Sequence, residues 1–176
     1  MALKIVGVKN PVLREIAKPV VKIDKKILEL VKEMLATLDV QKDPEGVGLA
    51  APQVGKSFRI FVVNYKNLKR VVINPEILKI DKKKKVNSES KKKDILEGCL
   101  SLPHYYGPIK RATSIKIKYL NEKGEEQIEE FTNFNAQIIQ HEIDHLNGVL
   151  FVDKILEQKA PLYKFDGDEW EEVELV

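Results

Sequence analysis

The stretch that most constrains this chain is residues 140–148, Gln-His-Glu-Ile-Asp-His-Leu-Asn-Gly. Four residues of a helix span about 400°, so His141 and His145 would lie on one face, one turn apart. Two imidazoles with this spacing can bind one divalent metal ion. Glu142 would lie roughly 100° around the helix from His141, where its carboxylate can act as a general base. The pattern predicts a metal-dependent hydrolase but does not say which one.

The residues around this stretch predict a helix. Apolar side chains recur there at spacings of three and four, namely Phe134, Ile138, Ile139, Ile143 and Leu146. We expect Asn133 or Asn135 to cap the start and Gly148 to end the helix in a left-handed turn. The alternative is a core helix with two hydrogen-bonded histidines. The chain has only three histidines, so two of them flanking a glutamate at this spacing favour a site.

Composition limits the class of protein. The chain has 176 residues, 43% of them hydrophobic and 32% charged, which predicts one globular domain over residues 1–176. A net charge of +3 is too small to indicate nucleic-acid binding. No apolar run approaches the roughly 18 residues of a membrane span. Residues 1–19 carry scattered charges and no apolar core, so we expect no secretory signal and a cytoplasmic location.

Cys99 is the only cysteine and cannot form an internal disulfide. It is an inert buried thiol, a nucleophile or a metal ligand, and taken alone the inert thiol is the commonest case. Residues 46–55 hold three glycines and two alanines. They predict either a loop that offers backbone groups to a substrate or a flexible connection, which in isolation is favoured.

The remaining pattern predicts mixed helices and hairpins. Asp24 should cap a helix whose buried stripe is Ile27, Val31, Met34 and Leu38. Other expected elements are a short helical turn at 11–14, strands at 58–63, 70–73 and 77–80, a hairpin over 113–120 and 125–131, an extended segment at 149–152, and a strand-like tail over 160–176 that turns at Asp166 and Gly167.

Residues 79–93 are dominated by lysine. They are expected to form a solvated loop, because like charges repel one another. The alternative is an electrostatic contact with ribosomal RNA. No aromatic residue interleaves the lysines, so base stacking is not expected there.

Three motifs together resemble one family. Residues 46–53 match G-x-G-L-A-A-x-Q, residues 97–101 match E-G-C-L-S, and residues 140–148 match Q-H-E-x-D-H followed by L-N-G. In this order and spacing, from Pro11 to about Asp153, the chain resembles the peptide deformylases. The resemblance implies an α+β fold, with small antiparallel sheets around the central helix. It also implies hydrolysis of the N-formyl group of the N-terminal formylmethionine of nascent polypeptides, releasing formate.

The resemblance implies a role for each motif. Cys99, His141 and His145 would bind the metal, expected to be Fe²⁺ in the cell, with Zn²⁺, Ni²⁺ or Co²⁺ also accepted by these ligands. One thiolate and two imidazoles leave a fourth position open, as a catalytic site requires. The other expected site residues are Glu142 as base, the Gln53 amide and Leu100 backbone N–H as oxyanion donors, Gly46, Val47, Gly48, Phe134 and Ile138 at the substrate, and Glu97 with Arg111 as an orienting pair.

Two alternatives stay open at this point. A zinc peptidase would need a further histidine or glutamate ligand downstream, but no histidine follows His145. A non-catalytic homologue that binds ribosomes is disfavoured by the intact Gln53, Cys99 and Glu142. His104 is expected to be exposed and not a ligand. We expect a monomer that acts on nascent peptides, with transient ribosome contact, no membrane and no sequence-specific nucleic acid.

Overall fold

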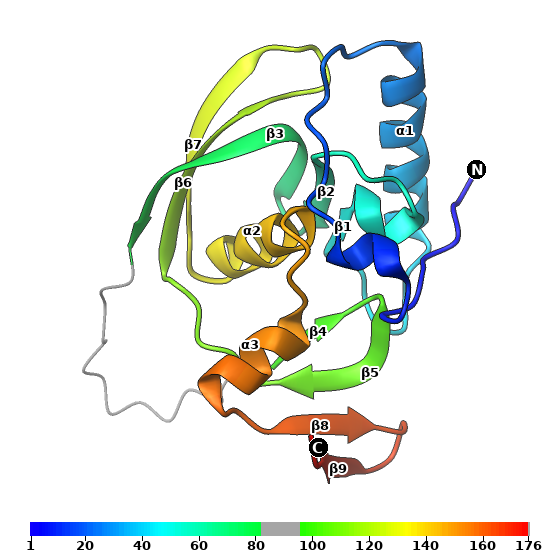
Figure 1. Ribbon diagram of the computed structural model, residues 1–176, viewed down its shortest axis with the longest axis vertical. Coiled ribbons are helices and arrows are strands. Elements are labelled where there is room, and N and C mark those ends of the chain that lie inside the picture. Colours follow the sequence, from blue (N-terminus) through cyan, green and yellow to red (C-terminus); the bar gives the residue numbers. More distant parts are fainter. Residues whose placement is uncertain (82–95, 176) are drawn as a thin grey trace.

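The computed structural model describes residues 1–81 and 96–175 and shows an α+β fold. Helix α2 (Asn133–Leu146) lies at its centre, between two antiparallel sheets (Figure 1). The five-stranded sheet has the order β1 (Gly48–Ala50), β2 (Ile60–Tyr65), β3 (Leu68–Asp81), β6 (Ser114–Leu120) and β7 (Glu126–Thr132). The four-stranded sheet has the order β4 (Glu97–Cys99), β5 (Leu102–Gly107), β8 (Leu162–Phe165) and β9 (Trp170–Val173).

Strand β2 of the five-stranded sheet is buried on both faces over residues 60–63. Along β2, Phe61 and Val63 pack in the cluster that contains α2, whereas Ile60 and Val62 pack with helix α1 (Lys25–Asp39). Successive side chains of a strand point to opposite faces, so an unbroken apolar run fits a strand between two helices. The sheet therefore fixes α2 on one side and α1 on the other.

The four-stranded sheet has its own smaller core. Helix α3 (Phe151–Gln158) places Phe151 and Ile155 against Cys99 and Leu162. Gly107 on β5 lets this helix come close, because a Cβ at that position would overlap the Ile155 side chain. Cys99 thus belongs to one sheet while α2 packs against the other, and the two sheets meet around the central helix (Figure 1).

Several predicted elements are confirmed. Asp24 caps α1, accepting a hydrogen bond of 3.0 Å from the Ile27 N–H, and the predicted stripe of α1 is buried. The 3₁₀ helix η1 (Pro11–Arg14) and the hairpin of β6 and β7 are present. So is the terminal hairpin of β8 and β9, with Gly167 at a φ of 108° in its turn. Gly148, at a φ of 73°, follows the end of α2 in the expected left-handed conformation.

Other predictions were wrong. The strands predicted at 70–73 and 77–80 are a single strand, because β3 continues through Asn74 and Pro75 to Asp81 with register shifts against β6 that accommodate the proline. The extended segment predicted at 149–152 is wrong in its second half: Leu150 has an extended backbone, but α3 begins at Phe151, and Asp153 in its first turn accepts a hydrogen bond of 2.8 Å from the Leu150 N–H.

The predicted N-cap of α2 and the predicted loop at residues 46–55 also need correction. Neither Asn133 nor Asn135 caps α2, since Thr132 takes the N-cap position without a side-chain hydrogen bond. Residues 46–55 are only partly a loop, because they contain β1 and the 3₁₀ helix η2 (Ala51–Val54). Of the lysine-rich stretch 79–93, the first three residues end β3 and the rest lies outside the described residues.

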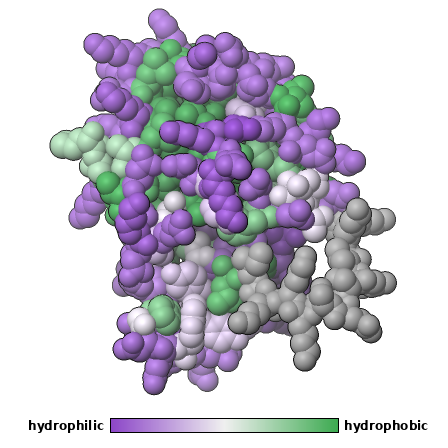
Figure 2. Space-filling model, turned by 180° about the vertical axis from the view of Figure 1, so that it is seen from behind, coloured by the Kyte–Doolittle hydropathy of each residue, from purple (hydrophilic) through white to green (hydrophobic). Residues whose placement is uncertain are grey.

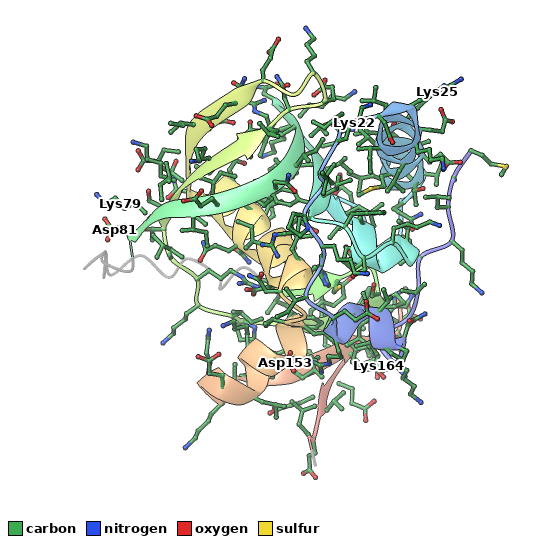
Figure 3. All side chains as sticks on the ribbon, turned by 45° about the horizontal axis from the view of Figure 1, so that its top comes forward. Lys22, Lys25, Lys79, Asp81, Asp153 and Lys164 are labelled. Atoms are coloured by element: carbon green, nitrogen blue, oxygen red, sulfur yellow. The ribbon has the colours of Figure 1, made fainter. Side chains whose placement is uncertain are left out.

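Charged side chains cover the outside of the molecule. Lys22, Lys25 and Lys79 project outward (Figure 3), and the view from behind is mostly hydrophilic, with apolar areas mainly in its upper half (Figure 2). Within residues 1–81 and 96–175, no helix has both the length and the apolar character needed to cross a membrane.

Glu129 on β7 connects three strands and gives a pH-dependent test of the fold. It accepts hydrogen bonds of 2.7 Å from Arg70 Nη2 on β3 and 2.8 Å from the Tyr119 hydroxyl on β6. Burial alone would raise the pKa of Glu129, but these hydrogen bonds outweigh it and lower that pKa. A lowered pKa means that the stabilisation is present at neutral pH and is lost as pH falls through the folded-state value.

We therefore expect Glu129→Gln to lower the free energy of unfolding by about 1 kcal/mol at pH 7, the upper range for a partly exposed pair. The difference from wild type should shrink as pH falls through the lowered pKa of Glu129, where the carboxylate of the folded wild type becomes protonated. Urea unfolding at several pH values measures both effects. Glu126→Gln, exposed on the same strand, is the control. A deficit that does not depend on pH would contradict the assignment.

Candidate metal centre and active site

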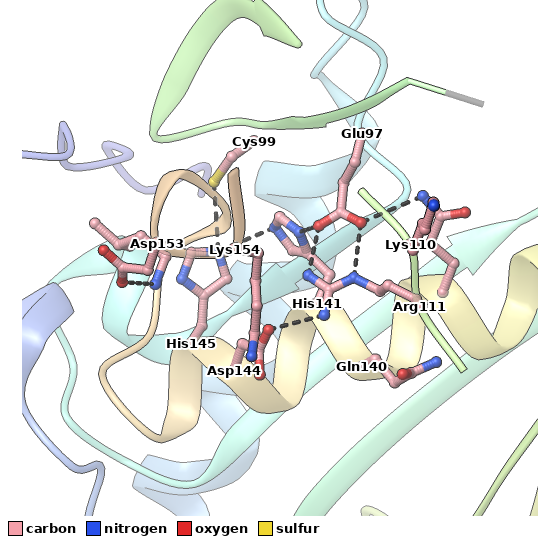
Figure 4. Close-up of polar contacts among 12 residues, drawn as sticks. Glu97, Cys99, Lys110, Arg111, Gln140, His141, Asp144, His145, Asp153 and Lys154 are labelled. Carbon is pink, nitrogen blue, oxygen red and sulfur yellow. Dashed lines mark hydrogen bonds and ion pairs between the residues drawn. The ribbon is translucent and has the colours of Figure 1, made fainter. Parts of the chain in front are cut away.

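Three side chains from two elements converge on one point. Cys99 ends β4, and His141 and His145 lie one turn apart on α2. Their ligand atoms all lie within 4.8 Å of one another. The His145 Nε2 atom is 3.4 Å from the Cys99 Sγ atom and 3.2 Å from the His141 Nε2 atom (Figure 4). The three residues predicted as ligands are therefore brought together, although Cys99 is far from the others in sequence.

The distances between these ligand atoms fit a metal ion with tetrahedral coordination. Metal–nitrogen bonds of about 2.0–2.1 Å and a metal–sulfur bond of about 2.3 Å place two nitrogens about 3.3 Å apart, and nitrogen and sulfur about 3.6 Å apart. The observed separations of 3.2 and 3.4 Å lie close to these values. His104 is half-buried, not exposed as expected, and is not part of the group.

A buried ion-pair network orients His141. The Glu97 carboxylate contacts the His141 Nδ1 atom at 2.5 Å, and Arg111 donates to both Glu97 oxygens at 2.6 and 2.7 Å. Arg111 also donates to Asp144 at 2.8 Å, and the side chains of Glu97 and Arg111 are both 6% exposed. Because Nδ1 is held by Glu97, Nε2 faces Cys99 and His145.

The charges of the network match this geometry. Burial alone would raise the pKa of Glu97, but Arg111 and His141 outweigh burial and hold that pKa well below its usual range. Burial alone would lower the pKa of His141, but the Glu97 carboxylate outweighs it and raises that pKa. Burial and the neighbouring His141 lower the pKa of His145. Glu97 thus stays ionised beside the histidine that it orients.

Two polar residues of α2 extend this network and were not singled out from the sequence. Gln137 donates to Glu97 at 3.2 Å. Gln140 accepts from the Ala112 N–H at 3.1 Å and donates to the Ala112 carbonyl at 2.9 Å, which ties the chain next to Arg111 to the helix. Residues four apart share a helix face, so Gln137 with His141 and Gln140 with Asp144 are pairs that the spacing could have identified.

Gln53 is fixed with its amide nitrogen facing the metal ligands. Its Oε1 atom accepts a hydrogen bond of 2.9 Å from the Ala50 N–H. Its Nε2 atom lies 3.5 Å from the Cys99 Sγ atom and 3.3 Å from the Ser101 Oγ atom. The side chain is buried, so the direction of the amide is set before any substrate binds.

Glu142 is buried beside the ligands. Its Oε2 atom is buried and has no hydrogen-bond partner among the described residues. Burial raises the pKa of Glu142 to about 7. A Cβ placed at Gly48 on β1 would overlap the Glu142 carboxylate, so only glycine lets this carboxylate lie against the strand. This explains the second glycine of the 46–53 motif.

A cavity of about 180 Å³ opens beside these groups. Its lining includes most of the predicted site residues, namely Val47, Gly48, Gln53, Cys99, Leu100, Phe134, Ile138, His141 and Glu142. The volume suits one side chain rather than a drug-sized ligand. Gly46 does not reach the wall; it packs where a Cβ would meet the Leu38 and Gln41 side chains. Tyr106 and Gly98 line the cavity and were not among the predicted residues.

Replacing one ligand tests the metal centre without reference to any reaction. His145→Ala removes one of three ligands, so we expect the bound metal to fall from about one ion per chain to near zero after gel filtration. His104→Ala, which changes the histidine outside the group, should keep the ion. Atomic emission spectrometry measures the content. Equal retention by both variants would contradict the ligand assignment.

Comparison with known proteins agrees with the motifs. The model of the polypeptide deformylase family matches residues 2–161. The chain is 44% identical over 155 residues to the peptide deformylase of Thermotoga maritima, covering 88% of each, and 45% identical over 151 residues to peptide deformylase 1 of Clostridium acetobutylicum, covering 86% of this chain and 93% of the relative.

Solved structures show the same fold. The crystal structure of the Thermotoga maritima peptide deformylase aligns with a TM-score of 0.77 at 44% identity, covering 88% of this chain and 97% of that one. A peptide deformylase from Synechococcus elongatus in complex with actinonin aligns with a TM-score of 0.75 at 36% identity, covering 86% of this chain and 78% of that one. The chain belongs to the polypeptide deformylase family.

Proposed function

We propose that this chain hydrolyses the N-formyl group of the N-terminal formylmethionine of nascent polypeptides, releasing formate. One observation carries the proposal: in a chain of this family, Cys99, His141 and His145 converge beside the buried Glu142 at one small cavity. The zinc-peptidase alternative finds no support, because the third residue of the group is the upstream Cys99. The match to enzymes over most of the chain likewise gives no support to a non-catalytic role.

The two sheets offer a place for an extended peptide. β1 and β4 are each at the end of their sheet, and both contribute backbone to the cavity wall through Gly48 and Gly98. An end strand carries backbone N–H and C=O groups that a further strand can bond. A formylated peptide bound in this way would lie between the sheets, with its formyl group toward Cys99.

The methionine side chain fits the apolar part of the cavity. Ile138 and Phe134 lie about one and two turns before His141 on α2, and Val47 and Leu96 line the same cavity. Contact with these side chains would remove the thioether from water, and burying such a side chain contributes roughly 1.5–3 kcal/mol. This burial would select methionine at the first position.

The residues present can carry out each proton transfer. A divalent cation on Cys99, His141 and His145 would supply Lewis-acid activation of a water molecule. Glu142 accepts a proton as the water oxygen attacks the formyl carbon. The Gln53 amide and the Leu100 N–H donate to the developing oxyanion. The C–N bond then breaks, and Glu142 gives its proton to the departing amine, leaving formate and a free N-terminal methionine.

The cation is proposed from the donor set and the motif resemblance. Thiolate and imidazole suit Fe²⁺, Zn²⁺, Ni²⁺ and Co²⁺, and we propose Fe²⁺ in the cell. Metal analysis of protein purified without oxygen tests this. A nascent-chain substrate also supports a cytoplasmic location with transient ribosome contact, and we propose that the enzyme is a monomer. The continuous family match over residues 2–161 supports one domain.

Glu142→Ala tests the proposed base. We expect formate release from formyl-Met-Ala-Ser to fall by a factor of 10² or more, the usual scale for loss of a general base. Metal content should stay unchanged, since Glu142 is not one of the three ligands. Retained turnover would remove Glu142 from the mechanism. Cleavage of an internal peptide bond by the wild type, without formate, would favour a peptidase instead.

Gly48→Ala tests the contact between β1 and Glu142. The added methyl group overlaps the carboxylate, so we expect kcat/KM to fall at least tenfold as Glu142 is displaced, the scale on which small misplacements affect catalysis. Gly7→Ala is the matched control, because a Cβ there meets nothing within 4 Å. Equal activity of the two variants would show that Glu142 need not lie against Gly48.

A further inference from the structure

The C-terminal hairpin lies outside the stretch that defines the family. The family match ends at residue 161, and the hairpin of β8 and β9 begins at Leu162. The hairpin nevertheless joins the sheet that carries Cys99, because β8 pairs with β5, which pairs with β4. It therefore extends, by two strands, the sheet whose β4 and β5 contribute to the wall of the candidate active site.

One face of this extended sheet packs against helix α3 in the smaller core. Leu162 and Val173 are paired across β8 and β9, and both pack in the cluster that contains Ile155 of α3. Tyr105 of β5 belongs to the same cluster. Directly opposite residues of paired strands point to the same side, so this side of the sheet is covered by α3.

The other face carries aromatic side chains. Register pairs place Gly98, Tyr106 and Tyr163 on it, and the alternation of side chains adds Phe165 with its partner Trp170. We call Tyr106, Tyr163, Phe165 and Trp170 the aromatic face. None of the four belongs to a buried core cluster of the described residues.

The members of the aromatic face contact one another. The Tyr106 and Trp170 ring centroids are 5.6 Å apart, and those of Phe165 and Trp170 are 4.7 Å apart. Trp170 is 52% exposed, although a ring of this size is usually largely buried. The outermost member of the face thus keeps half its surface in contact with solvent.

The aromatic face is continuous with the active-site cavity. Tyr106 and Gly98 both line that cavity. A Cβ at Gly98 would lie 2.7 Å from the Tyr106 ring, so the ring lies directly over the backbone between Glu97 and Cys99. The aromatic face therefore runs from the cavity wall at Tyr106 to Trp170, away from the metal ligands.

We propose that the aromatic face binds apolar or aromatic side chains of the formylated peptide, beyond the residue that follows methionine. The proposal rests on the proposed function, because that function fixes the formyl end at Cys99 and requires the rest of the peptide to leave the cavity. Each extended residue advances the chain by about 3.3 Å, so the third and fourth residues lie outside a cavity of this size. Trp170 is then a specificity-determining residue.

Two tetrapeptides of equal length test this. Wild-type enzyme should deformylate formyl-Met-Ala-Phe-Phe with a kcat/KM about three- to tenfold higher than formyl-Met-Ala-Ser-Ser, the scale of one or two aromatic contacts. Trp170→Ala should reduce that ratio to near one, and Trp170→Phe should restore most of it. Glu171→Ala is the matched control, since Glu171 is the exposed neighbour of Trp170 and points to the opposite face; its ratio should equal that of wild type.

Trp170 is the only tryptophan of the chain, so its fluorescence reports on the face directly. Adding the product peptide Met-Ala-Phe-Phe to the metal-loaded wild type should shift the emission to shorter wavelength as the ring loses water, and Met-Ala-Ser-Ser should not. This measurement needs no turnover and no folded variant.

Three results would each overturn the proposal. They are a wild-type kcat/KM ratio near one for the two substrates, a preference that persists in Trp170→Ala, and a tryptophan emission that does not change when Met-Ala-Phe-Phe is added. So would an equal slowing of both substrates in Trp170→Ala, which would indicate a general disturbance. An emission that shifts with protein concentration alone would assign the face to a second copy of the chain. If neither substrate released formate, the proposed function would be wrong. The fluorescence result would still show whether the aromatic face binds the aromatic peptide.

Discussion

The Glu97 carboxylate is the connection on which the site depends. It joins β4 of one sheet to α2, which packs on the other sheet, and each of its oxygens has two partners. Arg111 and His141 contact one oxygen, and Arg111 and Gln137 contact the other. A buried charge is costly unless it is paired and fully hydrogen-bonded, and here both conditions are met. This carboxylate therefore holds the strand that carries Cys99 against the helix that carries His141.

The site therefore lies between two sheets that meet around α2. The five-stranded sheet supplies Gly48 and, through η2, the orientation of Gln53, whereas the four-stranded sheet supplies Cys99 and Tyr106. Helix α2 contributes both histidines and Glu142 to the space between them. Such an arrangement leaves the outer edges of β1 and β4 beside the cavity, which is what recognition of an extended peptide requires.

The sequence was sufficient where the signal is local. The i, i+4 spacing of His141 and His145, the cap at Asp24 and the alternation in β6 each determine a structure within a few residues. It was insufficient where distant contacts decide. α3 forms because Asp153 caps it and because Phe151 and Ile155 pack against Cys99 of β4 and Leu162 of β8. The packing partners are distant in sequence, so no local pattern reveals them. β3 passes through Pro75 because irregular pairing with β6 spares the missing N–H.

The candidate site shows the same division. The three ligands, Glu142 and much of the cavity wall could be named from the motifs and the family resemblance, but Tyr106 could not. Tyr106 reaches the wall only because β4 and β5 pair in the register that sets it over Gly98. Gly46, by contrast, shares a motif with Gly48 but packs against Leu38, away from the cavity. A motif thus records which residues are needed, and the register of the sheets decides which of them face the substrate.

Binding of a single cation by one thiolate and two imidazoles can be measured by X-ray absorption spectroscopy at the metal edge of the loaded protein. We expect one sulfur at about 2.3 Å and two imidazole nitrogens at about 2.0–2.1 Å, with a lighter oxygen or nitrogen ligand completing the shell. A spectrum with no sulfur in the first shell would contradict this ligand assignment.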